Sequence, residues 1–256
     1  MNATSPAVEP VMFRAWRYLY RVPLLAWHVF VHLPILLLLL AVGRRGVADA
    51  ALRWWARWFL RIFGMRVRRE GAPLAGGTMF VANHVSWVDI VALHSQHMMG
   101  FIAKHEIRGW PVIGWLTTHT ETIYLRRGNS DSLGGVMEEM ASRLRAGRAV
   151  AAFPEGGTRD GNALGPFHAR IFTAAVAADA PVQPVALCYG DGCEAQSIVA
   201  FAARESFVAN LVRLLGEPSR PARVCFLAPI MHAEHEGRRG IATMARTRIA
   251  NAMQAG

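Results

Sequence analysis

Residues 79–89, which read MFVANHVSWVD, decide the fold. The run at 79–82 is apolar and too short for a helix, so it predicts a buried strand. Ser86 and Asp89 have the spacing of a capping box, which marks the start of a helix. A strand that leads through a short turn into a helix is the repeating unit of an α/β domain. Active sites of such domains gather at the carboxyl ends of the strands, so this turn is a candidate site.

The chain repeats this alternation up to its carboxyl end. Short apolar runs bounded by Gly, Pro, Asn or Arg predict further buried strands, and the stretches between them have helical composition. We therefore expect an α/β fold with a mainly parallel central sheet flanked by helices. Two prolines bracket the apolar run at 180–185, which predicts an edge strand beside the site. The expected strands are 78–82, 122–125, 149–153, 182–187 and 223–227, and the expected helices include 130–146, 167–178 and 240–254.

An amino-terminal segment at about 22–43 contains no Lys, Arg, Asp or Glu. A helix of this length measures about 33 Å, enough to cross a hydrocarbon core of about 30 Å. Pro23 and Pro34 permit a kink, so a membrane span and a re-entrant helical hairpin both stay open. We expect membrane-anchoring helices at 1–70 and one globular domain at 71–256.

A second segment, at about 51–67, predicts an amphipathic helix. Arg53, Arg57 and Arg61 recur every four residues and share one face, while Leu, Trp, Phe and Ile occupy another. Tryptophans beside arginines favour a helix in the bilayer interface over one docked on a soluble core. Arginines flank the apolar segment on both sides, so the charge pattern does not decide the orientation in the membrane.

Composition narrows the class of partner. The 256 residues are 53% hydrophobic and carry a formal net charge of +10, which favours anionic partners such as lipid headgroups, coenzyme A or an acidic carrier protein. The basic residues are dispersed and form no zinc-finger spacing, so we expect no nucleic-acid partner. The three cysteines include no CxxC pair. We expect them to be unpaired small apolar residues in a reducing compartment.

The turn after the first strand carries His84 and Asp89, five residues apart. Within one continuous helix these side chains would diverge by about 140°. We therefore expect His84 in the turn before the helix and Asp89 in the first turn of the helix. There the carboxylate can accept a hydrogen bond from one ring nitrogen, which leaves the other free to take a proton from a substrate hydroxyl. Asp89 also fits a structural role in the capping box, and the two roles are compatible.

A second constellation follows the strand expected at 149–153. Residues 153–161 read FPEGGTRDG. Gly156 and Gly157 let the backbone approach a ligand and offer N–H donors, and Arg159 is a forked cation suited to phosphate. A plain glycine-rich turn with a solvated arginine is the alternative. A third segment, at 122–129, is a strand that ends in two arginines, placed to bind an anionic headgroup or simply to face water.

Together with the run at 180–185, these blocks resemble the HxxxxD acyltransferases of glycerophospholipid synthesis, the 1-acylglycerol-3-phosphate acyltransferase family. The blocks occur in the family's order across about 80–186. The resemblance implies that His84 is a general base with Asp89 as its partner, and that the domain at 71–256 is an acyltransferase domain. It also implies that Arg127 binds the acceptor phosphate. The candidate substrate-binding residues are Lys104, Arg127, Glu155, Gly156, Gly157, Thr158 and Arg159.

The chain departs from the family pattern in two blocks. Glu121 and Arg126 stand where the family usually has Gly and Asp. Gly157 is an insertion that moves the following Thr and Arg one place on. A subgroup that includes lyso-ornithine-lipid acyltransferases ends this block in Asp-Gly, as do Asp160 and Gly161 here. The departures leave the identity of the acceptor open.

The resemblance implies transfer of a fatty acyl group from acyl-CoA or acyl-carrier protein to the free hydroxyl of a lysophospholipid. We expect 1-acylglycerol-3-phosphate as acceptor, giving phosphatidic acid. The alternatives are lyso-ornithine lipid or another lysolipid, and a catalytically inactive membrane lipid-binding protein. We expect no metal and no cofactor besides the acyl donor, because the histidines form no HExxH pattern. The expected location is the inner membrane, with the catalytic domain facing the cytoplasm.

Overall fold

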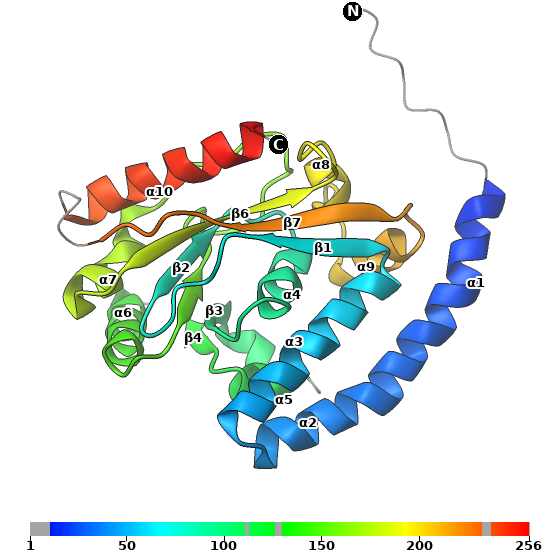
Figure 1. Ribbon diagram of the computed structural model, residues 1–256, viewed down its shortest axis with the longest axis horizontal. Coiled ribbons are helices and arrows are strands. Elements are labelled where there is room, and N and C mark those ends of the chain that lie inside the picture. Colours follow the sequence, from blue (N-terminus) through cyan, green and yellow to red (C-terminus); the bar gives the residue numbers. More distant parts are fainter. Residues whose placement is uncertain (1–10, 111–112, 126–129, 232–236, 256) are drawn as a thin grey trace, which may run out of the picture.

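A computed structural model describes residues 11–110, 113–125, 130–231 and 237–255. Its centre is a seven-stranded sheet in the order β1-β7-β6-β2-β5-β3-β4 (Figure 1). All neighbouring strands are parallel except β6 and β7. The strands are β1 Met65–Glu70, β2 Met79–Ala82, β3 Gly100–Lys104, β4 Ile123–Leu125, β5 Val150–Ala152, β6 Val182–Tyr189 and β7 Arg220–Phe226. The sheet confirms the predicted α/β fold.

Helices cover both faces of the sheet, because successive strand residues point to opposite sides. Phe80 and Ala82 of β2 pack in one apolar cluster with α2, α3, α4 and α9, whereas Met79 and Val81 pack in another with α6, α7 and α10. The helices are α1 Val11–Trp27, α2 Leu33–Val42, α3 Arg45–Ile62, α4 Val88–His94, α5 Ile113–His119, α6 Ser130–Arg145, α7 Thr173–Ala178, α8 Gln196–Val199, α9 Phe207–Leu215 and α10 Gly237–Gln254. Short π or 3-10 turns lie at His28–His32, His105–Gly109 and Ala169–Phe172.

The strand formed by residues 182–189 is not the edge strand that its prolines predicted. β6 lies in the sheet between β7 and β2. Proline has no N–H to donate to a neighbouring strand. Pro184 is tolerated because the ladder between β6 and β7 begins only at the next residue, Val185. Two strands, β1 and β3, were not predicted. β1 has too many arginines to read as a buried strand, since four of its six residues are exposed or partly exposed charged side chains at the sheet edge.

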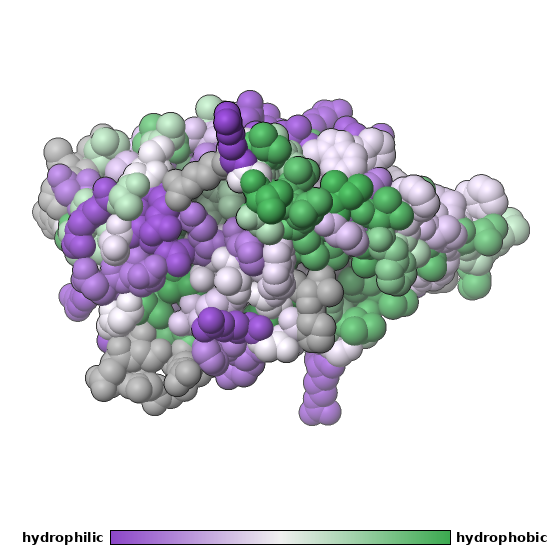
Figure 2. Space-filling view, turned by 90° about the horizontal axis from the view of Figure 1, so that it is seen from below, coloured by the Kyte–Doolittle hydropathy of each residue, from purple (hydrophilic) through white to green (hydrophobic). Residues whose placement is uncertain are grey.

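The amino-terminal helices form a hairpin, with α2 packed against α3 (Figure 1). Residues 11–42 are helical throughout, and a π turn at His28–His32 separates α1 from α2. The wide turn lies just before Pro34, whose ring cannot donate to the preceding turn. This helix is long and apolar enough to cross a membrane. Figure 2 shows apolar side chains gathered over the part of the surface that these helices form.

α1 is fastened to the globular part by a buried arginine. Arg21 is 1% exposed, and its guanidinium donates to the carbonyl oxygens of Leu215 (3.0 Å), the last residue of α9, and of Glu217 (2.7 Å), two residues further on. It also donates to the hydroxyl of Ser219 at 3.1 Å. Those carbonyls include the unpaired acceptors at the carboxyl end of α9, so the arginine caps one helix while it anchors another.

The segment at 51–67 is not one amphipathic helix. α3 covers Arg45–Ile62, Gly64 follows with a positive φ of 77°, and Met65 begins β1. A side chain at position 64 would collide with Ser219 and the Arg21 guanidinium, so only glycine fits the turn. Residues 65–70 therefore add a strand to the sheet, paired in parallel with β7.

The expectation of three unpaired cysteines was wrong. Cys188 and Cys193 form a disulfide, with Cα atoms 4.6 Å apart, and Cys225 is free and buried. The chain reverses just after β6, where Gly190 and Cys193 both have positive φ values, and this turn returns the second cysteine to the first. Sequence spacing alone carries no sign of that reversal.

Candidate active site

Two adjacent parallel strands bring the first two sequence constellations together. β2 pairs with β5, and the carboxyl ends of both strands lie at the same edge of the sheet. His84 follows β2 by two residues, and Phe153 follows β5 directly. The backbone N–H of Arg159 donates to the carbonyl oxygen of His84 at 2.8 Å, which ties the two loops together.

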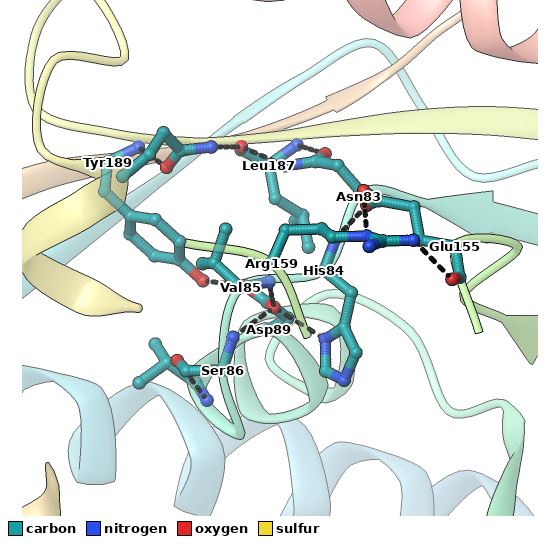
Figure 3. Close-up of polar contacts among 11 residues, drawn as sticks. Asn83, His84, Val85, Ser86, Asp89, Glu155, Arg159, Leu187 and Tyr189 are labelled. Atoms are coloured by element: carbon teal, nitrogen blue, oxygen red, sulfur yellow. Dashed lines mark hydrogen bonds and ion pairs between the residues drawn. The ribbon is translucent and has the colours of Figure 1, made fainter. Parts of the chain in front are cut away.

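His84 and Asp89 lie as the five-residue spacing predicts (Figure 3). His84 precedes the helix, and Asp89 is in the first turn of α4. Nδ1 of His84 lies 2.8 Å from Oδ2 of Asp89. Because a carboxylate can only accept, Nδ1 carries the proton and Nε2 is left as the basic nitrogen. His84 makes no hydrogen bond through Nε2 to any described residue, and its side chain is 14% exposed, whereas that of Asp89 is fully buried.

The carboxylate of Asp89 also organises the turn around it. Oδ2 accepts the backbone N–H groups of Val85 (2.7 Å) and Ser86 (2.9 Å), and the Ser86 hydroxyl accepts the N–H of Val88 at 3.2 Å. The capping role and the contact with His84 therefore coexist in one residue. Because several donors surround this buried charge, the loss of solvation is compensated by hydrogen bonds.

The ring of Phe153 lies flat against the imidazole. The ring centroids are 3.9 Å apart and the planes differ by 10°. Phe153 in turn stacks on Phe101 of β3, with centroids 5.7 Å apart. The stacked rings of Phe101 and Phe153 cover one face of the His84 imidazole and keep its Nδ1 directed at Asp89.

Glu155 holds two backbone segments of the site together through hydrogen bonds to its carboxylate. It is 3% exposed, its Oε1 accepts the backbone N–H of His84 (2.9 Å), and its Oε2 accepts that of Gly165 (2.8 Å). Burial raises the pKa of this carboxyl above its ordinary value, although these two N–H groups and Arg159 oppose the rise. Both oxygens are thus engaged by the protein. Its contacts favour a role in shaping the site over direct binding of the acceptor.

The residues after Glu155 differ in what they can offer a substrate. The N–H of Gly156 donates to the carbonyl of Phe153 (3.1 Å), so this donor is engaged. Gly157 and Thr158 are exposed, and the N–H of Gly157 has no partner among the described residues. The guanidinium of Arg159 is 40% exposed, lies 3.5 Å from Oε2 of Glu155, and donates to that residue's carbonyl oxygen at 3.1 Å.

Two predicted substrate-binding residues cannot be placed at the site. Arg127 lies outside the described residues. Lys104 ends β3, which is separated from β2 by β5, and its side chain is not among those described. Their expected roles toward a phosphate stay predictions.

Sequence reasoning missed a third partner in the site. The hydroxyl of Tyr189, at the end of β6, donates to Oδ1 of Asp89 at 2.5 Å, and the whole side chain is buried. The contact joins residues 100 positions apart. No spacing rule relates two such residues. The only signal was a tyrosine at the end of an apolar strand that belongs to the same sheet.

A sequence profile of the Acyltransferase family matches residues 49–188, more than half of the chain. The chain belongs to this family. The matched segment of this acyltransferase contains His84, Asp89 and the FPEGG block, which confirms the resemblance drawn from the four blocks.

Relatives of this acyltransferase are named for different acceptors. The acyltransferase is 34% identical over 178 residues to the lyso-ornithine lipid O-acyltransferase of Pseudomonas aeruginosa, covering 70% of this chain and 69% of the relative. It is 33% identical over 175 residues to the 1-acyl-sn-glycerol-3-phosphate acyltransferase of Neisseria meningitidis serogroup B, covering 68% and 69%. The fold of the acyltransferase matches the crystal structure of the 1-acyl-sn-glycerophosphate acyltransferase PlsC from Thermotoga maritima. The TM-score is 0.74 at 18% identity, over 96% of this chain and 95% of that one.

Proposed function

We propose that this acyltransferase moves a fatty acyl group from acyl-CoA or acyl-carrier protein to the free hydroxyl of a lysolipid, with 1-acylglycerol-3-phosphate as acceptor and phosphatidic acid as product. One observation carries the proposal. The imidazole of His84 is held by Asp89 through Nδ1, its side chain is partly exposed, and its Nε2 makes no hydrogen bond to any described residue. This is the arrangement of a general base that takes a proton from an alcohol.

The reaction follows from that geometry. The acceptor oxygen attacks the thioester carbonyl as Nε2 of His84 takes the hydroxyl proton, and Asp89 stabilises the imidazolium that forms. The C–S bond then breaks, and the proton passes from Nε2 to the leaving sulfur. One C–O bond replaces one C–S bond, so no covalent enzyme intermediate is needed. The N–H of Gly157, which has no partner among the described residues, is the candidate donor for the tetrahedral oxyanion.

Support for a phosphate-bearing acceptor comes from charge. The guanidinium of Arg159 is partly exposed, and its backbone N–H is bonded to the catalytic loop at His84. A forked cation beside the base suits a phosphate close to the reacting hydroxyl. The relative from Neisseria, named for 1-acyl-sn-glycerol-3-phosphate, agrees with this acceptor.

Lyso-ornithine lipid is the second candidate acceptor, and specific observations favour it. Asp160 and Gly161 match the block ending of that subgroup, and three relatives named lyso-ornithine lipid O-acyltransferase are 30 to 34% identical over 69% or more of either chain. The pairing of Arg159 with Glu155 also reduces the charge that remains available for a phosphate. Both acceptors use the same base and the same donor.

An acceptor panel tests the proposal. The purified protein in detergent micelles is incubated with radiolabelled acyl-CoA, or acyl-carrier protein, and each of three acceptors: 1-acylglycerol-3-phosphate, lyso-ornithine lipid and lyso-phosphatidylethanolamine. We expect labelled phosphatidic acid as the main product, and a loss of about 10² to 10⁴ in rate for His84→Ala. The control His119→Ala, in α5, should retain the wild-type rate. Product with lyso-ornithine lipid alone would select the second candidate. No product with any acceptor would favour a lipid-binding protein without activity.

We also propose that the protein resides in the inner membrane with its catalytic domain facing the cytoplasm, where both donors are made. The apolar helix at 11–42 and the tryptophans Trp54 and Trp58, exposed on α3, support membrane attachment. Membrane fractionation tests the location. Protection of the domain from protease in intact spheroplasts, and its digestion in inverted vesicles, tests the orientation.

A further inference from the structure

Tyr189 lies on the side of Asp89 opposite to His84 (Figure 3). Its hydroxyl donates to Oδ1 of Asp89 at 2.5 Å, whereas His84 and two backbone N–H groups bond to Oδ2. Among the described residues, Tyr189 makes the only hydrogen bond to Oδ1. The two oxygens of one carboxylate are therefore bound by different parts of the chain, one by the catalytic turn and the other by the sheet.

The position of Tyr189 is set by β6 and its surroundings. Opposite it in the sheet stands Ala222 of β7. The backbone N–H of Tyr189 donates to Oε1 of Gln196 at 3.1 Å, and Nε2 of Gln196 donates back to the carbonyl of Leu187 at 2.7 Å. The disulfide of Cys188 closes the turn that follows. Tyr189 is thus held in place by contacts that do not involve α4, so its hydroxyl can fix the orientation of the Asp89 carboxylate.

The hydroxyl of Tyr189 is a neutral donor. Burial, and then the charge of Asp89 beside it, raise the pKa of the phenol well above its ordinary value near 10. Its proton is directed at Oδ1, and a hydrogen bond to a charged group is about twice as strong as one between neutral groups. Without this donor, Oδ1 would be buried without a partner, and the carboxylate would be free to rotate away from the imidazole.

We propose that Tyr189 is a positioning residue for acyl transfer: by holding Oδ1 of Asp89, it keeps Oδ2 aligned with Nδ1 of His84. The effects that we expect on the rate of acyl transfer rest on the proposed function. Tyr189 does not touch the imidazole, so its effect is transmitted entirely through Asp89. The other charged residues that contact His84, Glu155 and Arg159, come from the segment after β5 and bond to its backbone, and neither hydrogen bond involves Tyr189.

The test is Tyr189→Phe in the full-length protein, with Tyr18→Phe as a matched control. Tyr18 also loses one hydrogen bond, from its hydroxyl to the carbonyl of Val212 (3.0 Å), but lies on α1. We expect kcat of Tyr189→Phe to fall about 10-fold while KM stays within about twofold. The acidic limb of the pH profile of kcat/KM should move to lower pH. The reason is that a carboxylate no longer aligned with Nδ1 stabilises the protonated imidazole less. Tyr18→Phe should match the wild type in all three measurements.

A spectroscopic measurement makes the inference independent of activity. The proton on Nδ1 of His84, bonded to a carboxylate, is expected as a downfield NMR signal that His84→Ala removes. In Tyr189→Phe we expect this signal to shift or broaden, while Tyr18→Phe leaves it unchanged. An unchanged signal with wild-type kcat would overturn the inference. So would a loss of kcat that merely follows a lowered melting temperature, with the signal and the pH profile unmoved. If the wild type acylates no acceptor, the proposed function fails, and the NMR signal still decides whether Tyr189 positions Asp89.

Discussion

The imidazole of His84 is stacked on the ring of Phe153, with centroids 3.9 Å apart and planes within 10°. This contact joins the HxxxxD block to the FPEGG block at the side chains themselves, in addition to the backbone contacts. It also gives the first residue of the second block a function that its sequence did not reveal, since a phenylalanine before a proline is typical of any buried strand end.

The stack predicts a kinetic effect of Phe153→Leu. Leucine keeps the site apolar but removes the flat face that orients the imidazole. An aromatic pair contributes about 0.5 to 1.5 kcal/mol, so we expect kcat to fall about 2-fold to 10-fold. Initial rates of acyl transfer measure the effect. Phe13→Leu, at an exposed position of α1, is the control and should leave kcat unchanged. A wild-type kcat for Phe153→Leu would show that Asp89 alone orients the ring.

Glu155 predicts a pH dependence of stability. Burial raises its pKa in the folded state above the ordinary value of 4.5. The folded protein therefore binds this proton more tightly than the unfolded chain does, and the free energy of unfolding falls as the pH rises from about 4.5 through the folded-state pKa. Glu155→Gln has no such ionisation. The free energy of unfolding of both proteins is measured with denaturant across this pH range. The wild-type value minus the variant value should be larger at acidic pH than at neutral pH. A difference that is constant with pH would contradict the assignment.

Arg21 predicts a loss of stability when its side chain is shortened. Arg21→Ala leaves the carbonyls of Leu215 and Glu217 without their buried donor, which should lower the free energy of unfolding by about 3 kcal/mol. Thermal unfolding in detergent micelles measures the loss, and faster protease cleavage within α1 should accompany it. Arg66→Ala removes the same type of side chain from an exposed position of β1 and should change stability by less than about 0.5 kcal/mol.

The disulfide of Cys188 predicts a defined thiol count. In denaturant without a reductant, only Cys225 should react with a thiol label, and after reduction all three cysteines should react. Cys193→Ser should lower the free energy of unfolding by about 2 kcal/mol, because the bridge closes a short loop with a separation of five residues. Mass spectrometry counts the labels. Three labels on the unreduced protein would show that the bridge is not formed.

The parts of the site that the sequence could predict are those built from neighbours along the chain. His84 and Asp89 are five residues apart, and the helical geometry of α4 alone limits how they can meet. Each turn was expected after a strand of one parallel sheet, and the two turns meet because those strands, β2 and β5, are neighbours. Apolar runs marked those strands well, since strands buried on both faces carry few polar residues.

What could not be predicted depends on contacts between distant segments. Tyr189 reaches Asp89 only because β6 lies beside β2, and the prolines of β6 suggested the opposite position at an edge. The pairing of Cys188 with Cys193 depends on positive φ values that non-glycine residues rarely adopt. The role of Glu155 in holding the backbone of the site was missed for a related reason. Its partners are backbone N–H groups, which no sequence motif records.

The packing of α3 bears on how this enzyme can be produced for study. Its apolar face, including Leu52, Trp55 and Phe59, belongs to the same core cluster as Phe80 and Leu187 of the central sheet. Trp87, in the middle of the HxxxxD block, packs edge-on against Phe59. A fragment trimmed after the hairpin to make it water-soluble would therefore lose one wall of its interior, so detergents or nanodiscs that accommodate the whole chain are the appropriate route to an active preparation.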